Sequence, residues 1–245
     1  MIIDLHMHID DTRYTGLKVS AQDCVRAMDE GDVAAAAVMT LVDLPGPNPA
    51  AMELIADACH QFENRLYGFL RLQPEADEAE GLLRTAVTKL GFRGLKLHPV
   101  STLAHPAGDE TVSLVRVAGE LGVPTLFHCG DEPRSTPLAI AGTAAACPDS
   151  TIILGHMGGY YHVDEAIDVA EQYGNIVLET SAMPYPDKIA EAVRRIGADR
   201  VVYGSDGPMS PPALERQKVT VAGLSDDEVA LILGGNAQRL LGVSA

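Results

Sequence analysis

Imidazole and carboxylate side chains recur at short spacing near the amino terminus. The first group is Asp4-Leu-His6-Met-His8. Side chains alternate along an extended strand, so this spacing predicts that Asp4, His6 and His8 share one face. Two imidazoles on one face, about 7 Å apart along the strand, can converge on one divalent metal ion. A His-x-His pair alone is equally compatible with two histidines that are hydrogen-bonded inside a polar cavity.

Four later segments also end an apolar run with a polar side chain. They are Gly94-Leu-Lys96-Leu-His98, Thr125-Leu-Phe-His128, Ile153-Leu-Gly-His156 and Tyr203-Gly-Ser-Asp206. Unpaired polar groups are costly to bury, so structural needs alone do not explain an imidazole or a carboxylate at the end of five apolar runs. Three or four nitrogen and oxygen ligands around one divalent ion, with a position left open for water, describe a catalytic metal site.

Eight apolar runs alternate with Ala-rich amphipathic stretches, which predicts βαβ units and a parallel sheet. The predicted strands are 2–8, 34–40, 66–72, 93–98, 124–128, 151–155, 175–180 and 200–204, and the predicted helices lie near 20–30, 50–63, 77–90, 111–121, 137–146, 164–173, 187–197 and 211–220. Eight such units in 245 residues match a TIM-like (β/α)8 barrel that forms a single domain over residues 1–245. An open doubly wound sheet is the alternative, but no Gly-x-Gly-x-x-Gly follows the first strand. A barrel would gather the polar strand ends at one mouth.

Composition excludes several classes of partner. The formal net charge is −16, which disfavours binding to nucleic acid or to an anionic membrane surface. The longest apolar stretch, 33–39, is far shorter than the roughly 20 residues of a membrane span. No basic segment opens the chain as in a signal peptide, and the four cysteines form no Cys-x-x-Cys pair. We therefore expect a cytoplasmic protein with reduced thiols.

Several motifs resemble those of the amidohydrolase superfamily. They are Asp-Leu-His-Met-His, Phe-His-Cys-Gly, Gly-His-Met-Gly-Gly and Tyr-Gly-Ser-Asp-Gly-Pro, in this order. The resemblance is closest to the amidohydrolase-2 group, which includes aminocarboxymuconate-semialdehyde decarboxylase, and it runs from residue 1 to about 242. It implies that His6, His8, His128 and Asp206 bind one metal ion and that His156 acts beside it as an acid or base. Asp206 would also accept a proton from metal-bound water. The implied ion is Zn²⁺, with Mn²⁺ or another first-row metal as an alternative.

Lys96 and His98 are open to more than one interpretation. In binuclear members of the superfamily, a lysine at this point is carbamylated and bridges two metals, whereas the single-metal group that this chain resembles does not need such a bridge. Both residues are also candidate contacts for a substrate carboxylate. A structural alternative pairs Lys96 with Asp4 or Glu179 inside the barrel. Arg71 is a further candidate for bidentate binding of an anionic substrate.

The function expected from these residues is hydrolysis of a C–N or C–O bond in a small carboxylated molecule by a metal-activated water. Nonoxidative decarboxylation or hydration, a lyase reaction, is the alternative on the same scaffold. The short chain favours hydrolysis, because decarboxylases of this group are usually longer. A metal phosphoesterase is disfavoured because no histidine follows Asp206, and a noncatalytic binding protein would predict a broken ligand position. Glu179 and Ser181 are expected to orient a ligand histidine. A homodimer is compatible with the sequence.

Overall fold

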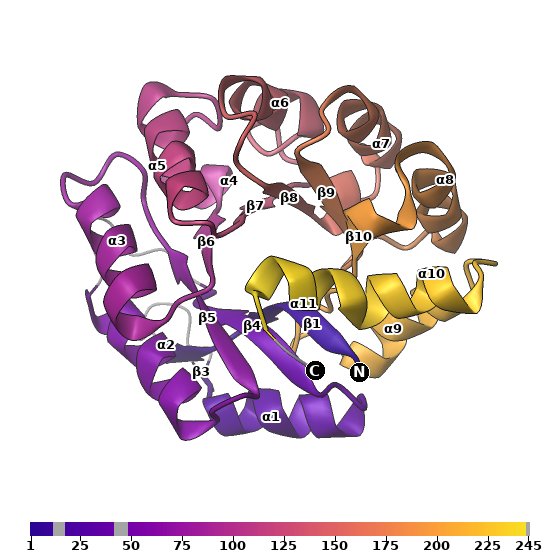
Figure 1. The fold of residues 1–245 in the computed structure, drawn as a ribbon, viewed down its shortest axis with the longest axis horizontal. Helices are drawn as coiled ribbons and strands as arrows, with labels where there is room; N and C mark the ends of the chain where they lie inside the picture. Colours follow the sequence, from indigo (N-terminus) through magenta and orange to yellow (C-terminus); the bar gives the residue numbers. More distant parts are fainter. Residues whose placement is uncertain (12–17, 42–48, 244–245) are drawn as a thin grey trace.

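Eight parallel strands form the barrel that the sequence predicts (Figure 1). The computed structural model describes residues 1–11, 18–41 and 49–243. The strands follow one another around the sheet in chain order: β1 (Ile3–His8), β4 (Ala35–Met39), β5 (Leu66–Arg71), β6 (Gly94–Leu97), β7 (Thr125–His128), β8 (Ile152–Gly155), β9 (Ile176–Glu179) and β10 (Val201–Val202). Each begins and ends within a few residues of its predicted bounds. The (β/α)8 fold class is therefore confirmed.

The barrel closes at a seam between the first and the last strand. The ladder between β1 and β10 is replaced by a single parallel bridge between Met7 and Gly207. The backbone N–H of Asp206 also donates to the carbonyl oxygen of His6, at 2.8 Å. The segment that carries Asp206 is thus attached directly to the strand that carries His6.

Helices cover the outside of the barrel. The long ones are α1 (Ala21–Glu30), α2 (Pro49–Gln61), α3 (Ala79–Leu90), α5 (Asp109–Glu120), α6 (Pro137–Ala146), α7 (Val163–Gln172), α8 (Pro186–Ile196) and α9 (Pro212–Thr220). Shorter elements are the hairpin of β2 (Asp10–Asp11) and β3 (Lys18–Val19), α4 (Pro99–Thr102), η1 (His156–Gly158), η2 (Ala198–Arg200), α10 (Asp226–Ala230), η3 (Leu231–Gly235) and α11 (Asn236–Leu241). In the part of the chain that the structure describes, no helix has both the length and the apolar character that a bilayer crossing requires.

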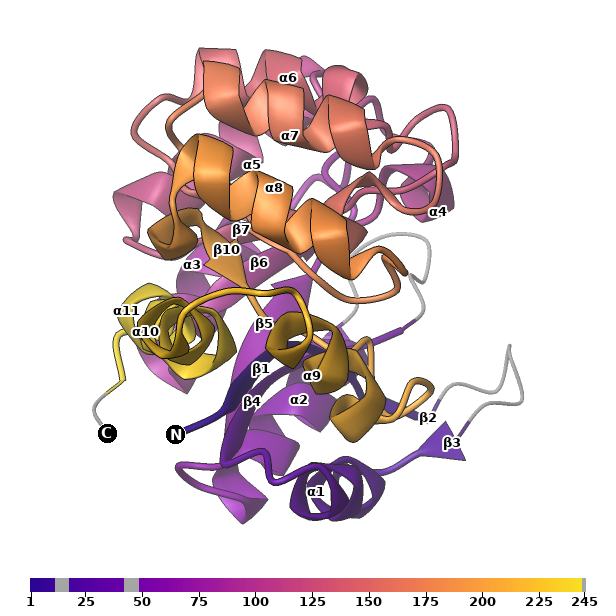
Figure 2. The same ribbon diagram turned by 90° about the vertical axis from the view of Figure 1, so that its right-hand side faces the viewer.

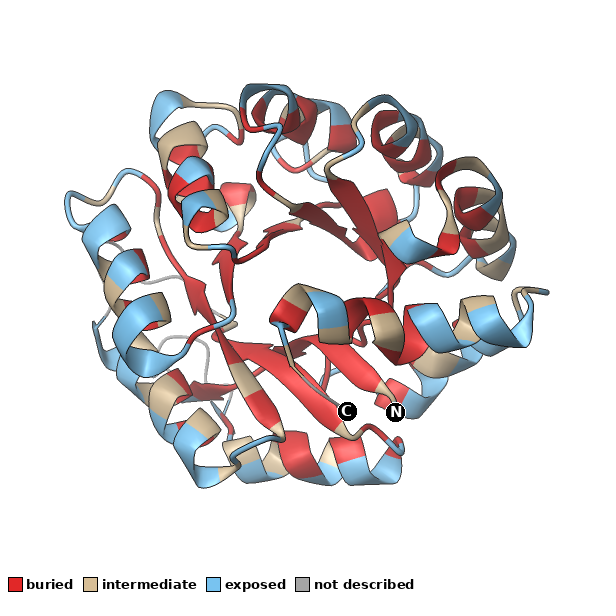
Figure 3. Ribbon diagram, in the orientation of Figure 1, coloured by how far each residue is buried: buried red, intermediate tan, exposed pale blue. Residues whose placement is uncertain are grey.

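Two hydrophobic layers hold the barrel together. The larger layer packs the outward side chains of the strands against the helices, and Figure 3 shows buried strands ringed by helices that are buried on one side only. The smaller layer fills the barrel interior with Ile3, Leu5, Ala35, Ala37, Met39, Phe69, Leu126, Ile153, Val177 and Val202, joined by Ala237 and Leu241 of α11. Figure 2 places α11 and the amino terminus at one end of the barrel and α4 at the other. The apolar interior therefore lies toward the α11 end of the barrel. The opposite end, on the side of α4, is the mouth where polar side chains can gather.

The first strand departs from simple alternation. Its pairing with β4 shifts register between Asp4 and Met7, which marks a bulge. Leu5 consequently packs in the barrel interior, whereas Met7 packs in the outer layer. The prediction that Asp4 shares a face with His6 and His8 is wrong, because the bulge reverses the alternation between them. Asp4 lies on the outer face of β1, and the two histidines face the interior.

Candidate metal centre

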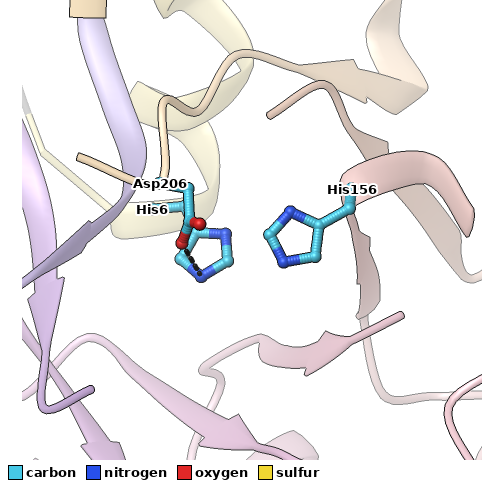
Figure 4. A group of neighbouring side chains, drawn as sticks. All are labelled: His6, His156 and Asp206. Carbon is cyan, nitrogen blue, oxygen red and sulfur yellow. Dashed lines mark ion pairs between the residues drawn. The ribbon is translucent and has the colours of Figure 1, made fainter. Parts of the chain in front are cut away.

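The predicted site residues gather at the mouth, where the carboxyl ends of the barrel strands meet. Ligand atoms of His6, His156 and Asp206 all lie within 4.8 Å of one another, and Figure 4 shows the ring of His156 facing the other two side chains. His8 Nε2 lies 3.0 Å from Asp206 Oδ1. His128 Nδ1 lies 3.1 Å from His156 Nε2. One cluster therefore contains the four histidines and the aspartate that the sequence analysis singled out.

The buried carboxylate of Glu179 holds two residues of this cluster in place. Its Oε2 atom lies 3.0 Å from His6 Nδ1 and accepts a hydrogen bond from the backbone N–H of His156 at 3.2 Å. The Ser181 hydroxyl donates to the same oxygen at 2.9 Å. A Cβ atom at Gly204 would clash with Glu179 and lie 3.0 Å from the Cβ of His6. Glycine at this position is what lets the buried carboxylate approach His6.

The partners of three imidazoles determine which ring nitrogen carries the proton. Nδ1 of His6 lies 3.0 Å from the Glu179 carboxylate, and Nδ1 of His8 lies 3.3 Å from the Thr40 carbonyl oxygen. Both partners can only accept a hydrogen bond, so both histidines are protonated on Nδ1. The Ser181 hydroxyl gives its proton to Glu179 and therefore accepts from Nδ1 of His156, at 2.9 Å. In all three residues Nε2 is left as a lone pair that faces the cluster.

His128 is held through its other nitrogen. Its Nε2 atom lies 3.3 Å from Oε2 of Glu132, which follows on the loop after β7. The hydrogen bond from His128 lowers the pKa of Glu132 to about 2, so this carboxylate is ionised and can only accept. Nε2 of His128 therefore carries the proton, and Nδ1 faces His156. Sequence reasoning missed Glu132; its only signal was a carboxylate four residues after His128.

These assignments leave two pairs of acceptors that face each other among the described side chains of the site. They are His8 Nε2 with Asp206 Oδ1 at 3.0 Å, and His128 Nδ1 with His156 Nε2 at 3.1 Å. Burial lowers the pKa of His8, and it lowers the pKa of His156 to about 4, so both rings are neutral near pH 7. A divalent cation bound among these atoms would satisfy both pairs. Imidazole nitrogens and one carboxylate are ligands that suit Zn²⁺ and other first-row ions, so the residues present fit a divalent metal.

Backbone conformation at two of these residues is unusual. Asp206 has φ +60° and His156 has φ +64°, and the adjacent Met157 has φ +46°. Positive φ is sparsely populated by residues other than glycine and concentrates at functional sites. Burial alone would raise the pKa of Asp206, but the close imidazoles of His8, His6 and His156 outweigh that effect and keep its pKa below the usual value. Asp206 is therefore a carboxylate at neutral pH.

Lys96 contributes a buried cation to the same cavity. Its Nζ atom lies 2.9 Å from His6 Nε2 and donates to that lone pair. Burial lowers the pKa of His6, and the charge of Lys96 lowers it further, so His6 is neutral. Asp4 lies on the opposite face of β1, so it is not the interior partner considered for Lys96. The ammonium group instead occupies the lone pair that a metal ligand would use.

His98 lies against the outer edge of the cluster. It caps the amino terminus of α4, where its Nδ1 accepts from the backbone N–H of Ser101 at 3.3 Å. Its ring stacks on that of His128, with centroids 4.0 Å apart and an interplanar angle of 5°. Burial lowers the pKa of His98, so the ring is neutral and its Nε2–H is a hydrogen-bond donor.

Arg71 is buried beside the site and binds backbone oxygens. It donates to the carbonyl oxygens of Thr40, at 3.2 Å, and Leu41, and to the Ser101 hydroxyl at 3.2 Å. The Thr40 carbonyl is the group that holds His8. Arg71 thus supports a histidine of the cluster, and direct binding of a substrate by Arg71 stays a prediction.

Solved structures with the same fold include three decarboxylases. The 2,6-dihydroxybenzoate decarboxylase from Rhizobium is 18% identical, with a TM-score of 0.75 over 98% of each chain. The 5-carboxyvanillate decarboxylase from Sphingomonas paucimobilis is 15% identical, with a TM-score of 0.77 over 99% of each chain. A dihydroxybenzoic acid decarboxylase from Polaromonas sp. JS666, with bound manganese and the inhibitor 2-nitroresorcinol, is 20% identical; the match has a TM-score of 0.74 and covers 98% of this chain and 96% of that one. At these identities the likeness establishes the fold alone.

Sequence comparison gives the family. No curated protein matches the chain by sequence. A family model described as Amidohydrolase matches residues 3–243, which is nearly the whole chain. The match covers every residue of the candidate metal centre, from His6 to Asp206. The resemblance inferred from the motifs is therefore confirmed, and the chain belongs to the amidohydrolase-2 family.

Proposed function

We propose that this protein is a metal-dependent lyase that removes a carboxyl group, as CO₂, from a small anionic molecule. The observation that carries the proposal is the convergence of imidazole and carboxylate ligand atoms at the barrel mouth, a set that suits a divalent ion. In the proposal His6, His8, His128 and Asp206 bind one divalent ion, and His156 is the acid–base residue. Zn²⁺ and Mn²⁺ both suit this ligand set, and a similar decarboxylase structure contains manganese.

A bound divalent ion would act as a Lewis acid that binds and polarises the substrate oxygens. The chain itself must move a proton, because the carbon that loses CO₂ has to gain one. His156 is suited to this step: its Nε2 lone pair faces the cavity and takes up a proton from solvent, which it then gives to that carbon. Its Nδ1–H donates to the Ser181 hydroxyl, which in turn donates to the Glu179 carboxylate. The negative charge of Glu179 therefore acts on the ring through this hydrogen-bonded chain. The charge of Glu179 offsets part of the burial effect that otherwise disfavours the imidazolium form of His156.

The other polar groups of the mouth fit an anionic substrate. Lys96 provides a buried positive charge, and His98 provides a neutral N–H donor at the outer edge. Both are proposed to bind a substrate carboxylate or an oxygen next to it. The similar solved structures include a 2,6-dihydroxybenzoate decarboxylase and a 5-carboxyvanillate decarboxylase, which are named for small aromatic acids. A small aromatic or unsaturated carboxylic acid is therefore the substrate class that we propose.

Decarboxylation is preferred here to the hydrolysis that the sequence favoured. The short chain does not exclude decarboxylation, because the matches extend over 96–99% of the decarboxylase chains. Length therefore does not separate the two reactions. The three similar decarboxylases support the lyase reaction.

The test uses metal-free protein reloaded with Mn²⁺ or Zn²⁺ and a panel of small hydroxylated aromatic and unsaturated acids. We expect CO₂ release equal to product formed and, in D₂O, one deuterium on the carbon that lost the carboxyl group. The matching amides, esters and lactones serve as the comparison set, and His156→Gln as the variant control. Turnover of amides, esters or lactones without CO₂ release from any acid would identify a hydrolase and refute the proposal.

A further inference from the structure

His128 differs from the other three imidazoles of the site in the nitrogen that it presents. The others are held by a hydrogen bond at Nδ1 and direct Nε2 into the site. The partners of their Nδ1 atoms are Glu179 for His6, Thr40 for His8 and Ser181 for His156. His128 is held through Nε2 and presents Nδ1. The orientation of this one ring therefore depends on a separate partner, Glu132, which lies in the loop after β7.

The loop is built to aim the Glu132 carboxylate. The fully buried Ser135 places its hydroxyl 3.0 Å from Glu132 Oε2, and its backbone N–H donates to the Glu132 carbonyl oxygen at 2.9 Å. The backbone N–H of Gly130 in turn donates to the Ser135 carbonyl oxygen at 3.1 Å. A Cβ atom at Gly130 would lie 3.1 Å from Glu132 Oε2 and 3.6 Å from His128 Nε2. Glycine keeps the space between carboxylate and imidazole open.

We propose that Glu132 is a positioning residue for the metal: by accepting from Nε2–H of His128, it turns Nδ1 of that ring into the site and makes it a better ligand. This inference rests on the proposed function, because it takes His128 as a ligand. A carboxylate on the far nitrogen of an imidazole fixes the orientation of the ring and raises its basicity. Ser135 acts one step further out, since its hydroxyl holds the carboxylate in place.

The proposal predicts weaker metal binding when the acceptor is lost. Removal of such a partner typically costs 10- to 100-fold in metal affinity. Because Glu132 is partly exposed, we expect about a 10-fold loss for Glu132→Gln, whose amide can also donate to the imidazole. Glu132→Asp keeps the charge and should restore part of the affinity, and Ser135→Ala should lose only a few fold.

The experiment measures Zn²⁺ and Mn²⁺ affinity of metal-free protein by competition with a chelator. Glu75→Gln is the matched control, because Glu75 is exposed on the loop after β5 at the same end of the barrel and none of its described contacts reaches a site histidine. An effect of surface charge alone would weaken binding equally in both glutamine variants and overturn the proposal. Unchanged affinity in Glu132→Gln would overturn it as well.

Nitrogen-15 NMR of the imidazoles in metal-free protein gives a second readout that needs no metal. We expect Nε2–H on His128 and Nδ1–H on His6, His8 and His156, with a share of Nδ1–H appearing on His128 in Glu132→Gln. A wild-type His128 protonated on Nδ1 would refute the role of Glu132. If wild-type protein binds neither ion, the proposed function fails, and the NMR result still decides whether Glu132 orients His128.

Discussion

Replacing Lys96 by methionine is expected to strengthen metal binding, whereas replacing a ligand weakens it. The Lys96 ammonium donates to Nε2 of His6 at 2.9 Å, in a part of the barrel that is closed to solvent. A metal ion that binds His6 through Nε2 has to displace this ammonium group. Methionine has a similar volume and flexibility but carries no charge and no donor, so it leaves the lone pair free.

The size of the effect follows from the interaction that the ion must break. A hydrogen bond that involves a charged group is worth about 1.5–3 kcal/mol. Each 1.4 kcal/mol corresponds to about tenfold in affinity, so the loss of this competitor should tighten binding by about 10- to 100-fold. Repulsion between the displaced ammonium and the ion acts in the same direction: two unit charges about 4 Å apart interact by about 4 kcal/mol at an effective dielectric constant of about 20.

The measurement compares Zn²⁺ affinity of wild-type protein, Lys96→Met and the control Lys89→Met by chelator competition. Lys89 is an exposed lysine at the end of α3, so its replacement changes the net charge equally without reaching His6. Lys96→Met should also raise KM for an acid substrate, because the proposed carboxylate contact is lost. Weaker binding in Lys96→Met, with a fall from two ions per chain to one, would refute this reasoning and favour a carbamylated Lys96 as a bridging ligand.

Three further predictions concern the histidine cluster and the first strand. His128→Ala should reduce the metal content of purified protein to a small fraction while the metal-free Tm is unchanged; full metal content would exclude His128 as a ligand. Asp206→Asn should retain part of the metal but lower kcat by about 10²–10⁴-fold, and wild-type turnover would remove Asp206 from the reaction. Burial raises the pKa of Asp4 from 3.8 to about 7, so the unfolded chain loses this proton at lower pH than the folded one. The carboxyl group therefore contributes stability below pH 4 that is lost as the pH rises to about 7, by about 4 kcal/mol. Asp4→Asn should remove that slope from urea-derived free energies of metal-free protein, and an unchanged slope would contradict the assignment.

The barrel was predictable because each of its units is local. A short apolar run followed by an amphipathic stretch specifies one strand and one helix, and the eight repeats leave few ways to arrange them. Capping signals also act locally: Ser20 with Asp23, and Ser225 with Glu228, form capping boxes at the starts of α1 and α10. The strand-end rule then gathered the histidines at one mouth without any knowledge of packing.

The details of the site were beyond this reasoning, because they depend on pairing and on side-chain contacts between distant segments. The bulge in β1 is defined by its register against β4, so alternation within residues 3–8 could not reveal it. The contact between Lys96 and His6 joins two strands 90 residues apart. Glu132 lies in a loop, where no strand or helix period predicts the direction of a side chain. Glu179 and Ser181 were predictable as supports only because Glu179 ends a strand and Ser181 follows two residues later.

The seam between β1 and β10 has a consequence for how the protein matures. His8 and Asp206 are 198 positions apart, yet their side chains meet across this seam. During synthesis the amino-terminal histidines emerge long before the aspartate, so the complete set of ligands exists only once the last strand has docked on the first. An ion that binds this set selects the closed barrel and stabilises it by mass action. Metal uptake would then report the completion of folding, and low metal supply would prolong the life of open, incompletely closed chains.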